Sequence, residues 1–400
     1  NVGLHDAELH ARHVFRRGDR LGAVVERART AIIKGQRHHI HRIDALVQAP
    51  HRRRVALTVL TALAAGLTAT MSLIRDDPRY LVPGLALLAL TAACSDLASV
   101  PYNAMLRALS TPQTAGRISG LGWAAGYAGS VTLLLVVYLG FIRGDGPRRG
   151  LLGIPVQDGL NVRSAMLLAA GWLVLFGMPL ILMSRNVAGA AAGPPDRLPG
   201  LVGSYRRLFA DLREEWQRDR NLVYFLVVSA VFRDGLSGVF AFGAVLGVSV
   251  YGVSQANVLI FGVVASTVAA VGALLGGRLD DRIGSKPVIV GSLAAVIVVG
   301  LILMALSGQV AFWVCGVLLC LFVGPAQSAA RTLLLRMTGE GKEGVVFGLY
   351  TTTGRAVAFL APWLFFVFVD RFGADRAGLG GICLVLAFGL LGMLRVKVPR

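Results

Sequence analysis

The sequence predicts an all-α protein that crosses a membrane many times, and three observations lead to this prediction. Of its 400 residues, 55% are hydrophobic and only 16% are charged, with a mean hydropathy of +0.66. Apolar windows of about 20 residues, the length that spans a bilayer as a helix, recur through most of the chain. Soluble domains of this size use shorter amphipathic helices instead. We therefore predict a polytopic helical bundle.

Ten windows are long and apolar enough to span a bilayer, four before a polar interruption in mid-chain and six after it. The sequence predicts these spans at residues 55–74, 79–106, 118–142, 162–183, 222–250, 256–277, 287–307, 309–331, 344–369 and 377–395. The predicted organisation is therefore a tail over residues 1–54, a four-span unit over 55–183, a linker over 184–221 and a six-span unit over 222–400.

The tail and the linker differ in composition from the spans. The tail holds all seven histidines and twelve of the lysines and arginines, and none of its windows can cross a membrane. Its stretch RLGAVVERARTAIIKG has apolar residues at helical spacing, so an interfacial helix is one alternative there. The linker is first rich in proline and glycine, and then YRRLFADLREEWQRDR places apolar residues on one helical face. We expect this second part to form a surface helix.

Charge in the loops predicts the orientation of the bundle. Beyond residue 54, one side carries eighteen lysines and arginines, Arg331 among them, and the other carries eight. Because cytoplasmic loops are richer in basic residues, we assign the richer side and the C-terminus to the cytoplasm, and the protein to the plasma membrane. The net charge of +18 is then explained mostly by the basic residues that set the orientation in the membrane. The sequence shows no clustered basic surface that would indicate binding to nucleic acid.

Residue types that hold metals or cofactors, or that perform covalent catalysis, do not form recognisable motifs. Cys94, Cys315, Cys320 and Cys383 lie in apolar runs without metal-site spacing, so we expect packing roles and no metal. The stretch GEGKEG at 339–344 lacks the phosphate-loop pattern, and neither GxSxG nor HExxH occurs. The sequence therefore predicts neither an enzyme nor a cofactor.

A short charged loop, GGRLDDRIGSKP at residues 276–287, lies between two spans on the predicted cytoplasmic side. It resembles the signature loop of the Major Facilitator Superfamily, and Gly277, Asp281, Arg282, Gly284 and Lys286 match the pattern. A serine, Ser285, replaces the usual basic residue before Lys286. The glycine permits close helix contact, Asp281 can face a neighbouring helix start, and the basic residues can meet carboxylates or helix ends. We expect a conformational gating loop, although a topogenic turn is an alternative.

Five further stretches resemble the branch similar to vacuolar amino-acid effluxers and their bacterial relatives. They are SVPYNAML at 99–106, GRISGLGWAAGYAG at 116–129, VFRDGLSGVFAFG at 231–243, GPAQSAARTLL at 324–334 and FGLYTTTGRAVAFLAP at 347–362. The resemblance implies two six-span halves with the solute pathway between them. The first half is two spans short of this pattern and the chain begins with Asn1, so we expect residues 1 to about 50 not to correspond to the family's first two spans.

Four charges lie at one depth within the predicted spans. Asp96, Arg233 and Arg355 each lie ten or eleven residues from a cytoplasmic end, roughly 15–17 Å deep, and Asp234 follows Arg233. Charge at mid-membrane is expensive and typically marks a solute or ion pathway. Adjacent helical residues point about 100° apart, so we expect Arg233 and Asp234 to use other partners or a helix break at Gly235. Fixed ion pairs, such as Asp234 with Arg355, are the alternative.

Tyr102 and Asn103 follow Pro101 in the span of Asp96 and extend the predicted polar lining, with an interhelical hydrogen bond as the alternative. Together these residues predict a secondary transporter that works by alternating access. An arginine would meet a carboxylate or phosphate of a small solute, and an aspartate would meet an amine or a coupling proton. Amino acids are the solutes that the resemblance implies, and no oligomer is required. A non-transporting interaction or sensor protein, or an inactive transporter fragment, is the rival interpretation.

Overall fold

The computed structural model describes residues 50–75, 77–144, 146–187, 210 and 212–398 of the chain. Ten helical segments in this part are long and apolar enough to cross a membrane, which confirms the predicted fold class and number of spans. The alternative of an interfacial helix in the tail, and most of the predicted linker, lie outside the described residues. Of the linker, residues 212–218 form a helical segment directly before the second unit.

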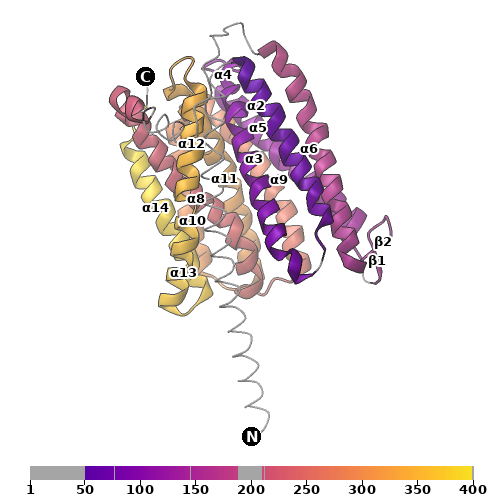
Figure 1. The fold of residues 1–400 in the computed structure, drawn as a ribbon. Coiled ribbons are helices and arrows are strands. Elements are labelled where there is room, and N and C mark those ends of the chain that lie inside the picture. Colours follow the sequence, from indigo (N-terminus) through magenta and orange to yellow (C-terminus); the bar gives the residue numbers. More distant parts are fainter. Residues whose placement is uncertain (1–49, 76, 145, 188–209, 211, 399–400) are drawn as a thin grey trace.

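The first unit contains four long helices and lies on one side of the bundle (Figure 1). They are α2 (Pro50–Thr70), α3 (Leu81–Ala104), α5 (Ala115–Val137) and α6 (Leu160–Val187), with the short α4 (Leu106–Leu109) after α3. The turns η1 (Met71–Leu73) and η2 (Pro78–Tyr80) join α2 to α3. A π-helical turn (Tyr138–Ile142) extends α5. The antiparallel strands β1 (Arg148–Arg149) and β2 (Ile154–Pro155) follow, with Arg148 opposite Pro155, and η4 (Gln157–Gly159) leads into α6.

The second unit supplies six spans from seven helices. They are α8 (Arg220–Ser249), α9 (Gln255–Ile283), α10 (Ser285–Ala305), α11 (Gln309–Met337), α12 (Glu343–Val357), α13 (Leu360–Phe372) and α14 (Gly378–Arg395), with the turn η5 (Asp375–Ala377) before α14. The predicted span 344–369 is interrupted, because the backbone leaves the helix at Ala358 and Phe359 between α12 and α13. The predicted span 309–331 is too short, because buried apolar residues extend α11 to Met337.

Glycines and capping side chains set several helix ends. Gly284 (φ +89°) separates α9 from α10, Gly308 (φ +90°) precedes α11, and Gly373 (φ +65°) ends α13. These positive φ values are strained for residues that carry a Cβ atom. The Asp219 carboxylate accepts hydrogen bonds from the backbone N–H groups of Asn221 and Leu222, and so caps the start of α8.

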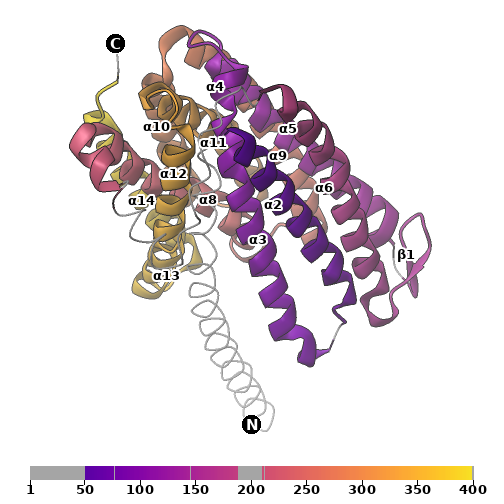
Figure 2. The same ribbon diagram turned by 45° about the horizontal axis from the view of Figure 1, so that its top comes forward.

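The two units meet along α5, which packs against α9 and α11, and along α3, which packs against α12 (Figures 1 and 2). A Cβ atom on Gly120 would collide with the backbone carbonyl of Ala273, and one on Gly116 would lie 2.6 Å from the carbonyl oxygen of Gly277. Glycine therefore permits the close approach of α5 and α9. We call the end of the bundle that carries residues 105–114, Gly284 and residues 338–342 the linker face.

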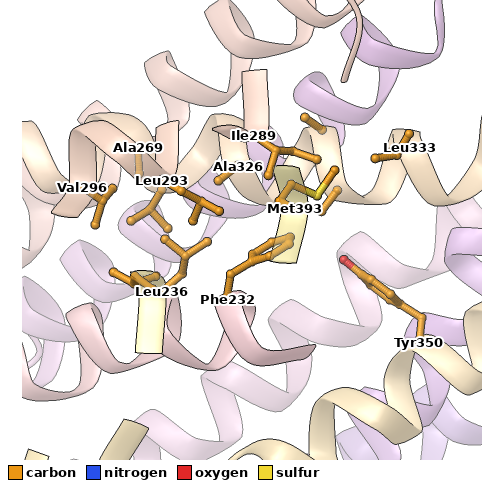
Figure 3. Close-up of a cluster of buried hydrophobic side chains, with 14 of the residues drawn as sticks. Phe232, Leu236, Ala269, Ile289, Leu293, Val296, Ala326, Leu333, Tyr350 and Met393 are labelled. Atoms are coloured by element: carbon orange, nitrogen blue, oxygen red, sulfur yellow. The ribbon is translucent and has the colours of Figure 1, made fainter. Parts of the chain in front are cut away.

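The main apolar core lies in the second unit (Figure 3). Phe232 and Leu236 of α8 pack with Leu293 of α10, and all three are fully buried. The first unit is far less enclosed. Of the residues in the apolar 18-residue window of α5, 6% are buried, whereas 56% are buried in the corresponding window of α8. The first unit therefore presents most of its side chains outward, whereas the second unit is more enclosed, except at α12–α13, where 11% of the apolar window is buried.

Candidate functional site

Asp96 of α3 and Arg355 of α12 form an ion pair across the two units. The Asp96 side chain is 27% exposed and the Arg355 side chain 47%, so the pair lies at an accessible surface between the units. The structure thus brings together two of the four charges that the sequence placed at one depth. The alternative pairing of Arg355 with Asp234 is not the one that the structure shows.

Arg233 of α8 is held by an aromatic ring and a carbonyl group. Its guanidinium carbon lies 3.8 Å from the ring centroid of Tyr350, and its Nη1 donates to the Tyr350 backbone oxygen at 3.1 Å. A Cβ atom on Gly354 would lie 3.2 Å from the same Nη1, so glycine leaves room for the guanidinium. Cation–π contact and a neutral acceptor stabilise the charge without neutralising it.

Asp234 points to the start of α13 rather than to an arginine. The carboxylate is 8% exposed, and its Oδ2 accepts a hydrogen bond of 2.6 Å from the backbone N–H of Ala361. A carboxylate at a helix N-terminus satisfies free N–H groups and complements the helix dipole. Of the two expected alternatives, separate partners and a break at Gly235, the structure shows the first: α8 is continuous at Gly235, and the break lies in the partner helix.

Tyr102 and Asn103 lie beside an arginine that the sequence analysis placed in a loop. Arg331 lies inside α11 and is 7% exposed, because the apolar run Thr332 to Leu335 continues the helix beyond it. Its Nη1 donates to Asn103 Oδ1 at 3.0 Å, and its guanidinium carbon lies 5.7 Å from the Tyr102 ring. Its Nε donates to Ser119 Oγ at 3.0 Å, and its Nη2 donates to the Ser119 backbone oxygen at 2.7 Å. The four apolar or small residues after Arg331 were the signal for its burial.

The signature loop contacts the first unit through Asp281. Its two carboxylate oxygens accept hydrogen bonds from the backbone N–H groups of Gly116, at 2.7 Å, and Arg117, at 3.0 Å. These two N–H groups belong to the first turn of α5, which has free donors. Gly277 lies one helical turn earlier, where a Cβ atom would lie 2.6 Å from the Gly116 backbone oxygen. Asp281 and Gly277 thus act on the same part of α5.

The other loop residues have partners inside the second unit or face outward. Lys286 donates through Nζ to the backbone oxygens of Leu394 and Val396, at 2.8 and 2.7 Å, at the end of α14. Gly284 forms the turn, and Arg282 is exposed.

Asp280, which the sequence analysis did not select, is 1% exposed and pairs with Arg336 of α11. Ser285 donates to Asp280 at 3.0 Å and accepts from Arg336 at 2.7 Å, so the serine that departs from the family pattern joins this pair.

A second contact between the units lies on the linker face. Arg107, after α3, pairs with Glu343 at the start of α12 at 2.6 Å, and its Nη2 donates to the backbone oxygen of Leu335. The preceding residue, Lys342, binds Glu214 and Glu215 of the linker segment at 2.8 and 2.7 Å. Hydrogen bonding to Lys342 lowers the pKa of Glu214 below its ordinary 4.5, and hydrogen bonding to Glu214 and Glu215 raises the pKa of Lys342 above 10.5.

An apolar cavity of about 130 Å³ lies within the second unit, away from the linker face. It is enclosed mainly by α8, α9 and α11, and its only hydroxyl-bearing side chain is that of Ser266. None of the residues that the sequence predicts for the site or the gating loop lines it, although Cys320, for which we expected a packing role, does. The polar contacts and the cavity are therefore separate features.

The sequence matches one family model and two curated proteins. The model described as "Vacuole effluxer Atg22 like" matches residues 44–400. An uncharacterised Major Facilitator-type transporter, YxiO of Bacillus subtilis, is 20% identical over 294 residues, which cover 74% of this chain and 66% of that protein. Autophagy-related protein 22 of Yarrowia lipolytica is 24% identical, covering 64% of this chain and 46% of that protein. The chain thus spans about two thirds and about half of the lengths of these relatives.

Solved structures share the fold at low sequence identity. The E. coli fucose:proton symporter FucP is 14% identical with a TM-score of 0.64, over 94% of this chain and 92% of that one. The proton:xylose symporter XylE is 15% identical with a TM-score of 0.67, over 92% of this chain and 86% of that one. Both are Major Facilitator transporters, and the likeness extends to the arrangement of the helices.

Proposed function

Because the chain belongs to the family of proteins like the vacuole effluxer Atg22, within the Major Facilitator transporters, we propose that it moves a small solute across a membrane by alternating access. The protein is an integral membrane protein by its helices and its family. One observation carries the proposal: Asp96, Arg233 and Asp234 all contact the interrupted segment α12–α13. Charged side chains around a broken membrane helix are typical of solute sites in secondary transporters.

The contacts support different proposed roles for the charges at this site. Arg355 is neutralised by Asp96, and Asp234 is held by the start of α13, whereas among the described residues Arg233 contacts a ring and a carbonyl but no carboxylate. Arg233 is therefore the residue that we expect to meet a carboxylate or phosphate of the solute. Asp96, which is more exposed than Asp234, is the residue that we expect to meet an amine or a coupling proton. Amino acids are the solutes that we propose, and no cofactor enters the mechanism.

The gating part of the proposal rests on the linker face. Asp281 holds the start of α5, and Gly277 allows the close contact that this requires. Arg107 and Glu343 join the units at a second point. Both contacts must break if the units separate at this face, so their rupture is the conformational switch that we propose. Gly284 and Lys286 keep the loop in place, and Arg282 faces outward at the same turn.

Flux into reconstituted vesicles tests this function. Purified protein is placed in liposomes and offered a panel of radiolabelled amino acids, with and without a pH gradient. We expect uptake of at least one solute, and Arg233→Gln and Asp96→Asn should each reduce it. Arg220→Gln removes an exposed charge at the start of α8, outside the gating loop, and is the matched control. Uptake that both variants leave unchanged would show that this site does not carry the solute. No uptake of any solute would favour the non-transporting or inactive-fragment alternative.

We also propose that the protein lies in the plasma membrane, with the linker face and the C-terminus on the cytoplasmic side. We propose further that a monomer suffices for transport. The support is the excess of lysine and arginine on this side of the predicted spans. A reporter fused after residue 400 tests the orientation, since alkaline phosphatase is active only outside the cytoplasm and a fluorescent protein reports the inside. An active phosphatase fusion would reverse the assignment.

A further inference from the structure

Among the described residues, the groups that bind the buried guanidinium of Arg331 are all neutral. Its acceptors are the Asn103 amide oxygen and the Ser119 hydroxyl and carbonyl oxygens. Within the described part of the chain, no Asp or Glu oxygen lies within 4.0 Å of it. An arginine cannot lose its proton at ordinary pH, and a buried charge without a counter-charge is expensive. This position therefore carries a cost that the closed arrangement only partly offsets.

A short internal repeat shows why the counter-charge is missing. The sequence PYNAMLR at 101–107 matches PAQSAAR at 325–331 in its proline and arginine, so Arg107 corresponds to Arg331. The sequence GRISGL at 116–121 likewise matches GVVFGL at 344–349. Arg107 pairs with Glu343, the residue directly before GVVFGL, whereas the residue directly before GRISGL is Ala115. One arginine of the repeat thus has a carboxylate partner, and the position that corresponds to this partner for the other arginine holds an alanine.

Every contact that balances Arg331 comes from the other unit. Asn103 and Tyr102 belong to α3 and Ser119 to α5, whereas Arg331 belongs to α11. If the units separate at the linker face, all of these contacts break at once. The guanidinium, six residues from the end of α11 and so roughly 9 Å inside it, would then face the opening with its five donors free.

We infer that Arg331 is a binding site for a small anion, which enters when the units separate at the linker face. The site takes an oxyanion or halide, because a guanidinium fork pairs best with such groups. Next to it, a Cβ atom on Gly122 would lie 3.0 Å from Arg331 Nη2 and 2.9 Å from the Tyr102 hydroxyl, so glycine at 122 leaves the fork unobstructed. The inference rests on the proposed alternating access. It differs from the role proposed for Arg233 because the anion binds Arg331 in only one state, the one that is open at the linker face.

An anion that binds only the open state must shift the population toward that state. A pair of spin labels across the linker face measures this shift, at Ala108→Cys and Glu340→Cys, which are both exposed. The native cysteines are first replaced by serine. Distances are measured in gluconate, chloride and acetate at equal ionic strength. We expect chloride or acetate to raise the ratio of long to short distances at least about fivefold over gluconate, the lower end of typical coupling.

Variants separate the anion site from a purely structural role. Arg331→Gln should abolish the anion effect, Arg331→Lys should retain part of it, and Arg220→Gln, at an exposed position outside the gating loop, should leave it intact. Asn103→Asp places a carboxylate where the amide oxygen now accepts from Arg331, so it should favour the short distance in every anion. An effect of acetate alone would identify the anionic group of a solute, and an effect of chloride would identify a free anion.

Three results would overturn the inference. A parent protein that shows both distances in a ratio independent of the anion would refute the site while leaving alternating access intact. An anion effect that persists unchanged in Arg331→Gln would place the anion elsewhere. A parent that shows only the short distance in every anion would refute the inference and the proposed alternating access together.

Discussion

Asp96 of α3 and Arg355 of α12 are joined by an ion pair that crosses from one unit to the other. Both side chains are partly exposed, so water screens their attraction and little free energy of unfolding depends on it. The same pair must nevertheless break or move whenever the two units change their relative position. The ion pair should therefore affect the equilibrium between relative positions of the two units more than it affects the free energy of unfolding.

A double-mutant cycle over Asp96→Asn and Arg355→Gln tests this separation. We expect a coupling free energy of unfolding of no more than about 1 kcal/mol, because exposed pairs contribute little. The spin-label pair at residues 108 and 340 should at the same time show more of the long distance in either single variant. A coupling far above this value, with unchanged distances, would make the pair a structural lock instead.

Substitution of Asp234 should depend on whether the new side chain can still accept a hydrogen bond. Asp234→Asn keeps an oxygen that can face the Ala361 N–H, whereas Asp234→Ala leaves that buried donor unsatisfied. We expect Asp234→Ala to lower the free energy of unfolding by about 1–2 kcal/mol more than Asp234→Asn, as for loss of a helix cap. Thermal unfolding measures the difference, and faster amide exchange at Ala361 should accompany it. Equal stability of the two variants would argue against the capping role.

Two glycines of α5 provide a matched pair for testing the contact with α9. Gly120→Ala would drive its methyl group into the backbone of Ala273, whereas no atom lies within 4 Å of the corresponding position at Gly126. We expect Gly120→Ala to cost about 1–3 kcal/mol in free energy of unfolding, as overpacking does. Gly126→Ala should be neutral or slightly stabilising, since alanine favours helix. Similar melting temperatures for both variants would show that α5 and α9 can separate at no cost.

The number and placement of the membrane helices could be predicted because hydropathy reports the bilayer directly. The ends of these helices were harder to predict from the sequence. Arg331 was treated as the end of its span because it is charged, yet the apolar residues after it keep it inside α11. The break after Val357 was missed as well, because residues 356–369 are apolar or small on both sides of it and the cap of the second half-helix, Asp234, comes from another element.

The charged residues of the site could be selected from sequence, but their pairing could not. Spacing placed Asp96, Asp234 and Arg355 at one depth, but it carries no information about which helices are neighbours. Only the tertiary structure shows that Arg355 meets Asp96 while Asp234 meets a backbone N–H group. The same limit applies to Asp280, whose partner Arg336 is separated from it by 56 positions in the chain.

The linker segment should stay attached to the bundle only within a window of pH. Lys342 lowers the pKa of Glu214, so this contribution is present above pH 4.5 and is lost as the pH falls through the lowered value. The pKa of Lys342 is raised, so its contribution is present below pH 10.5 and is lost as the pH rises through the raised value. Attachment should thus be strongest between these two limits and weaken outside them.

Spin labels at Gln217→Cys and Glu340→Cys, both exposed positions, report this attachment. The distance between them should be short and narrowly distributed at neutral pH and should broaden at both extremes. Lys342→Met removes the shared partner of Glu214 and Glu215, so its distribution should be broad and should not depend on the ionisation of Lys342. Glu214→Gln should leave the contact between Lys342 and Glu215 in place, so its distance distribution should be only partly broadened. If Lys342→Met behaved like the parent at every pH, the linker would be held by other contacts and the two carboxylates would not govern it.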